Sequence, residues 1–418
     1  MRSPNAASGA TGPSGRAESG TPDAGPVCDW LIGQALIATP VDRLLAGCSQ
    51  RLAAAGIPIL RGHISATTLH PQFEAVSFTW HRDAGLESEG HQHGSGQRTI
   101  WQRSPLLPIA RGDVDRVRHR LDDAAADETH PVLAEFRSAG GTDYVAFGTA
   151  FGVGGEVPAV VRTGTLSSWL TDRPGGFHDG QLGALARIQP PFAAAQRVAL
   201  NMAIAQTVMA TYLGADAGAR VLDGEIRRGD VQVINAAIFY ADLRGFTALS
   251  DRVDRAALVP MLDDYLERIA DPVAARGGQV LKFLGDGLLA TFALDGGDPA
   301  PVCAAALAAA AEALQGVRAF NSGRSAAGRP VMDLDVALHI GDVLYGNVGT
   351  ESRMEFTVIG PAVNAASRIE ALCGDLDCNL LISGAFAAAA GGSGFRSLGR
   401  HALRGIREPQ ELFAAATG

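Results

Sequence analysis

The chain has 418 residues, of which 47% are hydrophobic and 19% are charged, and its formal net charge is −9. This length predicts two or three domains, and the negative charge argues against a nucleic-acid partner, which normally requires a basic face. The five cysteines form no closely spaced CxxC pair, as expected for free thiols in a reducing compartment. No run approaches the roughly 18 apolar residues of a membrane span. We therefore expect a cytoplasmic protein.

Changes in composition divide the chain into four segments. Residues 1–27 are rich in Gly, Ser, Pro and Ala, which predicts a disordered tail. Residues 28–190 mix helical spacing with short strand patterns such as "FEAVSFTW", which predicts one α+β domain. Residues 191–232 are predicted to be a helical signalling linker, and residues 233–418 a second α+β domain.

The linker helix, expected over 191–213, carries apolar residues at alternating spacings of four and three. This spacing is typical of a coiled-coil seam and predicts a homodimer. An amphipathic helix that packs on its own domain is the alternative, because barely two heptads are present. The residues of the stripe are Val198, Met202, Ala205, Met209 and Tyr212.

The last segment alternates strand and helix patterns. "VINAAIFYAD" is predicted to be a strand that ends on Asp242, and Gly285-Asp286-Gly287 is the tip of a predicted hairpin. "LDVALHIGDVLYGNVG" is predicted to form a second hairpin around Gly341-Asp342. "GPAVNAASRIEAL" is predicted to be a helix with Pro361 in its first turn.

Two carboxylates are expected to converge in this segment. Asp242 at a strand end and Asp286 at a hairpin tip would together bind a hard cation, because Mg²⁺ is held by few protein oxygens plus substrate phosphates. The turn after Asp242 offers the backbone N–H groups of Gly245, Phe246 and Thr247 as a phosphate cradle. In the alternative interpretation, each aspartate is only a turn former.

A pair of polar residues lies on one helix of the same segment. Asn364 and Arg368 are four residues apart and therefore share one helical face. Arginine suits the charge that develops on a phosphoryl group, because its donors form a rigid fork. A solvated helix face is the alternative.

At this point the sequence resembles the class III nucleotidyl cyclases over about residues 233–413. The motifs that carry the resemblance are "FYADLRGFT", "VLKFLGDGLLATF", "HIGDVLYGNVG" and "EFTVIGPAVNAASRIEAL". The resemblance implies a ferredoxin-like catalytic domain that forms a head-to-tail homodimer with active sites at the interface. It also implies conversion of ATP to 3′,5′-cyclic AMP and pyrophosphate with two Mg²⁺ or Mn²⁺ ions per site.

The resemblance also assigns roles to residues of this chain. They are metal binding for Asp242 and Asp286, transition-state stabilisation for Asn364 and Arg368, purine selection for Lys282 and Thr357, and triphosphate binding for Arg404. Many adenylate cyclases of this class carry aspartate where this chain has Thr357, and the chain resembles a threonine-type subset. Lysine donates and a threonine hydroxyl can accept, which complements adenine and favours ATP.

Several alternatives remain at this stage. The domain could be an ATP-binding signalling pseudoenzyme or a guanylate cyclase, whereas a diguanylate cyclase is disfavoured because "LGDGLL" lacks the Gly-Gly-Asp/Glu-Glu-Phe signature. In front, "DRPGGFHDGQLGALARIQPPFAAA" resembles the end of GAF-like sensor domains, which implies an unknown small-molecule or protein signal.

Two groups of residues in the front half have open roles. Trp80, Trp101 and Trp169 could line a pocket or pack in a core. The polar "HRDAGLESEGHQH" is predicted to be a loop whose residues His81, His91 and His93 either bind a metal or are solvated.

Overall fold

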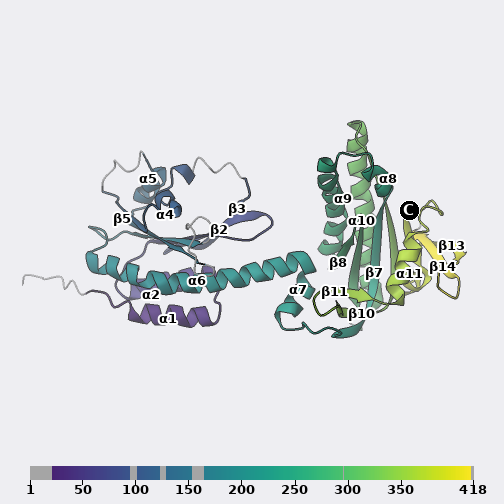
Figure 1. The fold of residues 1–418 in the computed structure, drawn as a ribbon, viewed down its shortest axis with the longest axis horizontal. Helices are drawn as coiled ribbons and strands as arrows, with labels where there is room; N and C mark the ends of the chain where they lie inside the picture. The colour runs from purple at the N-terminus through teal and green to yellow at the C-terminus, as the bar shows by residue number, and fades with distance from the viewer. Residues whose placement is uncertain (1–20, 95–100, 123–128, 153–163, 295, 416–418) are drawn as a thin grey trace, which may run out of the picture. The chain divides into compact units, whose positions relative to one another are not determined.

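The computed structural model describes residues 21–94, 101–122, 129–152, 164–294 and 296–415. The chain divides into two compact units, Met1–Val208 and Met209–Gly418, each built on one sheet (Figure 1). Of the predicted disordered tail, residues 1–20 lie outside the described residues. The first helix begins at Gly25, so the predicted end of that tail at residue 27 is slightly too late.

The N-terminal unit is a six-stranded antiparallel sheet in the order β3-β2-β1-β6-β5-β4. Its strands are β1 Arg61–Thr67, β2 Phe73–His81, β3 Gly85–Gln92, β4 Arg116–Arg120, β5 Asp143–Ala150 and β6 Gly164–Thr171. Its helices are α1 Gly25–Leu36, α2 Val41–Ala54, α4 Leu107–Arg111, α5 Pro131–Ser138 and the first part of α6 Asp179–Leu213.

Helices cover both faces of this sheet (Figure 1). Alternate residues of β5 enter different cores: Val145 joins the core under α1, α2 and α6, whereas Tyr144 joins the core under α4 and α5. This arrangement confirms a mixed helix and sheet fold, while the resemblance to a GAF domain stays a prediction.

Tryptophan and histidine side chains that the sequence singled out make packing contacts or hydrogen bonds within this unit. Trp80 and Trp169 are buried in the core, and Trp101 is 37% exposed. The prediction of a polar loop is wrong, because "GLESEGHQ" forms the edge strand β3. Nearly all residues of this strand are exposed, so the sequence lacks the alternation of apolar and polar residues that indicates a strand. The imidazole Nε2 of His91 lies 2.9 Å from Ser77 Oγ. Within the described ranges, no group of three or more His, Cys, Asp or Glu side chains could hold a metal.

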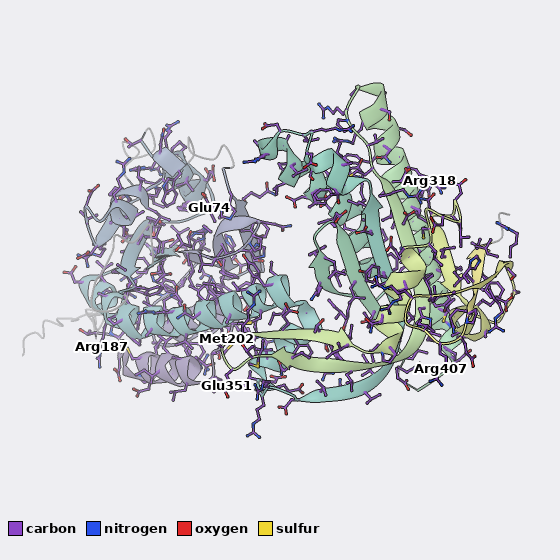
Figure 2. The ribbon with its side chains drawn as sticks, turned by 45° about the vertical axis from the view of Figure 1, so that its right-hand side comes forward. Glu74, Arg187, Met202, Arg318, Glu351 and Arg407 are labelled. Atoms are coloured by element: carbon purple, nitrogen blue, oxygen red, sulfur yellow. The ribbon has the colours of Figure 1, made fainter. Side chains whose placement is uncertain are left out.

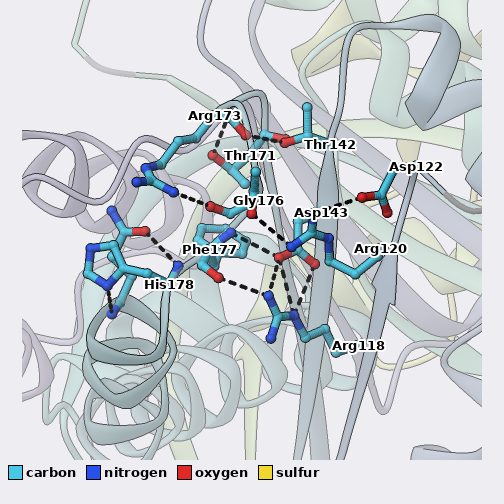
Figure 3. A network of polar contacts seen from close by, with 12 residues as sticks. Arg118, Arg120, Asp122, Thr142, Asp143, Thr171, Arg173, Gly176, Phe177 and His178 are labelled. Atoms are coloured by element: carbon cyan, nitrogen blue, oxygen red, sulfur yellow. Dashed lines mark hydrogen bonds and ion pairs between the residues drawn. The ribbon is translucent and has the colours of Figure 1, made fainter. Parts of the chain in front are cut away.

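A buried ion pair anchors the turn that leads into α6 (Figure 3). The carboxylate of Asp143 is fully buried and accepts hydrogen bonds from Arg118 Nη2 at 2.8 Å and from the backbone N–H of Phe177 at 2.9 Å. Gly176 has φ +70°, and a Cβ there would lie 2.5 Å from the Asp143 carboxylate. The turn over 172–178 therefore needs glycine and is tied to the sheet.

Helix α6 is longer than the helix predicted over 191–213. It begins at Asp179 and continues through Pro190 and Pro191. Proline at 191 leaves the carbonyl of Arg187 without its helical donor, and the thiol of Cys28 lies 3.9 Å from that oxygen. The buried residues of α6 end at Leu200, and Met202, labelled in Figure 2, is 45% exposed.

The C-terminal unit contains the second sheet, in the order β13-β14-β12-β10-β7-β9-β8 with β11 paired to β10. Its strands are β7 Val231–Arg244, β8 Gln279–Leu284, β9 Gly287–Leu294, β10 Asp333–Gly349, β11 Met354–Ile359, β12 Leu380–Ser383, β13 Phe395–His401 and β14 Gln410–Ala415. Its helices are α7 Ala215–Leu222, α8 Phe246–Ser250, α9 Arg255–Ala275, α10 Pro299–Ala326, α11 Pro361–Glu370 and α12 Gly384–Ala389.

The succession β7-α9-β8-β9-α10-β10 is a βαββαβ unit with antiparallel spatial order β10-β7-β9-β8. This is the ferredoxin-like arrangement that the sequence predicted. α9 and α10 pack on one face of the sheet, and α11 packs on the other face (Figure 1).

Two strand predictions are wrong in this unit. β7 does not end on Asp242 but continues to Arg244, and 333–349 is one long strand rather than a hairpin around Gly341-Asp342. Gly341 pairs with Ala236 in an unbroken register with β7. A Cβ at Gly341 would lie 2.9 Å from the Cβ of Ala362, so this glycine lets α11 approach the strand instead of making a turn.

Helix α10 is the one helix in the described part of the chain that is long and apolar enough to cross a membrane by length and composition. It is not an unbroken apolar run, because Glu312 interrupts it. Packing explains its apolar character, because one side of the helix is buried in the core of the C-terminal unit. The buried residues of α10 are Cys303, Ala306, Ala309, Ala310, Ala313, Leu314 and Val317.

Candidate active site

Asp242 lies near the end of β7 on the face that α11 covers. Side chains alternate along a strand, so Asp242 shares its face with Ile238 and Tyr240, and Ile238 packs in the core beneath α11. Directly across the sheet, Asp242 pairs with Asp335 of β10. The strand register therefore places two carboxylates side by side.

The hairpin between β8 and β9 brings Asp286 to the same place. Gly285 adopts φ +74° at the tip, which favours glycine. A Cβ at Gly287 would lie 2.7 Å from the carbonyl oxygen of Ala241 and 2.8 Å from Asp242 Oδ1. Glycine therefore lies on both sides of Asp286 for two reasons. Gly285 lets the tip turn sharply, and Gly287 lets it pass close to Asp242.

The charges of these carboxylates act on one another. Burial raises the pKa of Asp242 to about 6, with further contributions from the neighbouring charges of Asp286 and Asp335. Burial likewise raises the pKa of Glu370, at the end of α11, to about 7, and Asp242, Asp335 and Asp286 contribute. Glu370 is thus a fourth acidic group at the site, which the sequence did not predict.

One of the four carboxylates has a cationic partner. Arg244 donates two hydrogen bonds to Asp335, at 2.8 and 2.6 Å, and Asn379 Nδ2 donates a third at 2.9 Å. Burial, Asp286 and Asp335 all raise the pKa of Asp242, and no positively charged side chain among the described residues lowers it. Asp242 and Asp286 therefore fit a divalent cation, which would supply the missing positive charge.

The predicted phosphate cradle follows β7 directly. Gly245 adopts φ +89°, and the short helix α8 starts at Phe246, whose side chain packs against the core. Gly245 and Thr247 are exposed. The backbone N–H groups of the first helical turn have no intrahelical acceptor, so they are available to an anion beside the carboxylates.

Lys282 lies on β8 and Thr357 lies on β11, and an ion pair links these two strands. Lys282 Nζ of β8 lies 3.0 Å from Glu355 Oε2 of β11, and both side chains are partly exposed. Thr357 is two residues farther along β11 and is 8% exposed. Glu355 is a further residue that the sequence did not predict, and it adds a carboxylate beside the lysine.

Asn364 and Arg368 lie on one face of α11, as predicted. Arg368 Nη1 donates to the backbone carbonyl of Asn364 at 3.3 Å. A Cβ at Gly405 would lie 3.9 Å from Arg368 Nη2, so the loop between β13 and β14 passes beside this arginine. Arg404 precedes that glycine and is exposed. The structure thus places Arg404 next to the Arg368 end of α11.

The comparisons with known proteins agree with this geometry. Residues 231–413 match the family model described as the adenylate and guanylate cyclase catalytic domain. An adenylate cyclase of Anabaena cylindrica is 33% identical over 158 residues, which are 38% of this chain and 31% of that protein. Adenylate cyclase 1 of Rhizobium meliloti is 32% identical over 152 residues, which are 36% of this chain and 22% of that protein. The chain therefore spans no more than 31% of the length of these two relatives.

Solved structures are also similar to part of the chain. The adenylyl cyclase CyaB from P. aeruginosa is 26% identical with a TM-score of 0.41, over 45% of this chain and 97% of that chain. The guanylyl cyclase Cya2 is 26% identical with a TM-score of 0.40, over 44% of this chain and 93% of that chain. From the family match and the sequence relatives, residues 231–413 are a class III adenylate and guanylate cyclase catalytic domain.

Proposed function

We propose that this domain converts ATP to 3′,5′-cyclic AMP and pyrophosphate. The convergence of Asp242 and Asp286 beside the Gly245–Thr247 turn carries the proposal, because it sets a cation site next to a phosphate cradle. Both curated relatives described above are named adenylate cyclases, which supports the same reaction class.

In the proposed reaction, the ribose 3′-hydroxyl loses its proton to solvent and its oxygen forms a bond to the α-phosphorus, while the bond from that phosphorus to the bridging oxygen of pyrophosphate breaks. Asp242 and Asp286 would hold Mg²⁺ or Mn²⁺, which when bound acidifies a coordinated hydroxyl and balances triphosphate charge. Arg368 and Asn364 would stabilise the charge of the pentacoordinate α-phosphorus in the transition state. Arg404 would bind the triphosphate.

The site is proposed to form between two copies of the chain. In this proposal, the metal carboxylates of each site come from one protomer and Arg368 from the other, which predicts a homodimer with two equivalent sites. The N-terminal unit would regulate the pairing in response to a small-molecule or protein signal, transmitted by α6.

Purine choice is proposed to depend on Lys282 and Thr357, a donor and an acceptor that complement adenine. Glu355 makes GTP the second candidate substrate, because its carboxylate, 3.0 Å from Lys282, is the kind of group that guanine N1–H requires. The proposal favours ATP because the ion pair with Lys282 occupies this carboxylate.

The test is product formation by the purified full chain with ATP or GTP, in Mg²⁺ or Mn²⁺, followed by chromatography of the nucleotides. We expect cyclic AMP with a preference for ATP, and a shift towards GTP in a Lys282→Glu, Thr357→Cys double variant. A Glu355→Gln variant should keep the ATP preference. Nucleotide binding without cyclic product from either substrate would instead identify a pseudoenzyme.

A further inference from the structure

A cavity of about 490 Å³ lies in the N-terminal unit, between α5 and one end of the sheet. Arg61 of β1 and Leu170 of β6 line it from the sheet, and Phe136 lines it from α5. The two sheet residues are cross-strand partners. The cavity belongs to the sensor half of the chain, and the proposed cyclase reaction does not use it.

Arg61 is a partly buried cation without an acidic partner. Its Nη2 lies 3.3 Å from His63 Nδ1 and 3.3 Å from Thr79 Oγ1, and its guanidinium carbon lies 4.9 Å from the centre of the Phe136 ring. These contacts use one of the three guanidinium nitrogens. In the described part of the chain, no carboxylate forms an ion pair or hydrogen bond with Arg61, although the charge of Glu87 acts on it from farther away, and nothing accepts a hydrogen bond from its Nε or Nη1.

Burial makes the charged form of Arg61 unfavourable, and this is seen in the direction of its pKa shift. Burial lowers the pKa of Arg61 below the usual arginine value, because a desolvated cation without a counter-ion is unfavourable. Neutral contacts compensate the charge only in part. An anion that accepted hydrogen bonds from Nε and Nη1 would complete the coordination of the guanidinium.

The other residues that line the cavity limit which kind of anion could bind there. Leu60, Val132, Phe136 and Leu170 make one part of the wall apolar. A second cation, Arg82, is already paired with Asp172 at 2.7 Å.

The remaining polar groups of the lining oppose additional negative charge. His81 has its pKa lowered by burial and by Arg61, which keeps its ring neutral near pH 7. Asp83 and Glu135 are exposed carboxylates on the same cavity. One available cation faces two acids, so a ligand with a single negative charge fits better than a phosphate dianion.

We propose that this cavity binds a small organic monocarboxylate, whose carboxylate group accepts a forked hydrogen bond from Arg61 Nε and Nη1. Its apolar body packs against Phe136 and Leu170. A bidentate contact of this kind is specific for arginine, because lysine cannot present two parallel donors.

Benzoate and hexanoate are the probes, with benzamide and inorganic phosphate as matched controls. Each is titrated to about 10 mM into the full-length protein, because ligands of this size have a low affinity ceiling, and binding is followed by ligand-observed NMR. Arg61→Met removes the fork, Arg61→Lys retains the charge without the fork, and Arg82→Gln removes the other cation. Cyclase activity and circular dichroism report whether each variant is folded.

We expect benzoate or hexanoate to bind the wild type and the Arg82→Gln variant, and benzamide and phosphate not to bind. Affinity should fall by about tenfold or more in Arg61→Lys, as expected for the loss of a charge-assisted bidentate contact. A Phe136→Ala variant should also bind more weakly if Arg61→Met does not fold. Binding that is unchanged in folded Arg61 variants, or no binding of either carboxylate to the wild type, would overturn the proposal.

Discussion

The carboxylate of Asp242 lies among three other acidic side chains, and this concentration of charge is the chief property of the catalytic unit at the scale of single residues. Arg244 compensates Asp335, whereas Asp242 and Glu370 both have raised pKa values. The fold therefore holds negative charge together at a cost in stability, as functional sites often do. The first of the following two predictions tests a member of this group, and the second tests the arginine that is proposed to act at the same site.

Replacing Glu370 with glutamine should stabilise the protein at alkaline pH. The pKa of Glu370 rises from 4.5 to about 7 on folding, so the folded state binds this proton more tightly than the unfolded state. Stability is therefore lost as pH rises from about 4.5 to about 7, and the loss is complete above that range. Urea unfolding of wild type and Glu370→Gln at about pH 5 and about pH 8 measures the effect.

The difference in the free energy of unfolding between these two proteins should be larger at the higher pH. An exposed carboxylate on α9, Asp271, provides the matched control, since Asp271→Asn should show no such dependence. An equal difference at both pH values for Glu370→Gln would contradict the electrostatic account of the site.

Replacing Arg368 with alanine should lower kcat more than it weakens ATP binding. Its proposed role is to stabilise charge that develops only in the transition state, and losses of such contacts typically lower kcat by about 100- to 1000-fold. Arg407→Ala, at an exposed position of the same unit, is the control and should be nearly as active as wild type. An increase in KM with unchanged kcat would show that Arg368 serves substrate binding instead.

Local patterns were sufficient to predict part of the site. The Gly285-Asp286-Gly287 tip and the spacing of Asn364 and Arg368 are short-range signals, and the structure has both. Glu355 was missed because it reaches Lys282 across 73 positions of sequence. Asp335 was missed for the same reason, since it reaches Asp242 only through the pairing of β10 with β7.

At the scale of elements, glycine led to one correct and one wrong prediction of a hairpin. Gly285 has the positive φ that a tight turn favours, and the predicted hairpin is present there. Gly341 lies in the middle of β10, where its missing side chain allows α11 to pack closely. The same residue type thus marks a turn in one place and a close contact in another, and the sequence alone does not separate the two cases.

Helix α6 is the element that joins the two units, and its second half offers an apolar stripe. Val198 and Met202 are 40% and 45% exposed, and Tyr212 is 82% exposed. We predict that this stripe pairs with its copy in a homodimer, so that a charge at Met202 or Met209 weakens dimerisation. Sedimentation of Met202→Glu and Met209→Glu measures the effect.

Ala203→Glu is the matched control for these variants, because it adds the same charge to the same exposed part of α6 at a position outside the stripe. This control should remain dimeric at concentrations where Met202→Glu dissociates. Equal dimerisation of all three variants and the wild type would show that α6 does not form the seam.

At the scale of the whole molecule, the proposed cyclase activity is a property of two chains. A signal in the N-terminal unit could then act by changing how two catalytic domains are placed, which is a rigid-body switch. Small displacements would be sufficient, because a misplacement of about 1 Å between reacting groups can cost about 100-fold in rate. The central claim is therefore that metal carboxylates and Arg368 of one working site come from different chains.

Complementation between inactive variants tests this claim most directly. Asp242→Ala and Arg368→Ala are each expected to be inactive, and their mixture, after subunit exchange, should recover about a quarter of wild-type cyclic AMP production, since half of the dimers then hold one intact site. A mixture of Asp242→Ala with Asp286→Ala should stay inactive, because both changes damage the same half of the site. Exchanged Asp242→Ala and Arg368→Ala heterodimers that remain inactive would contradict the account.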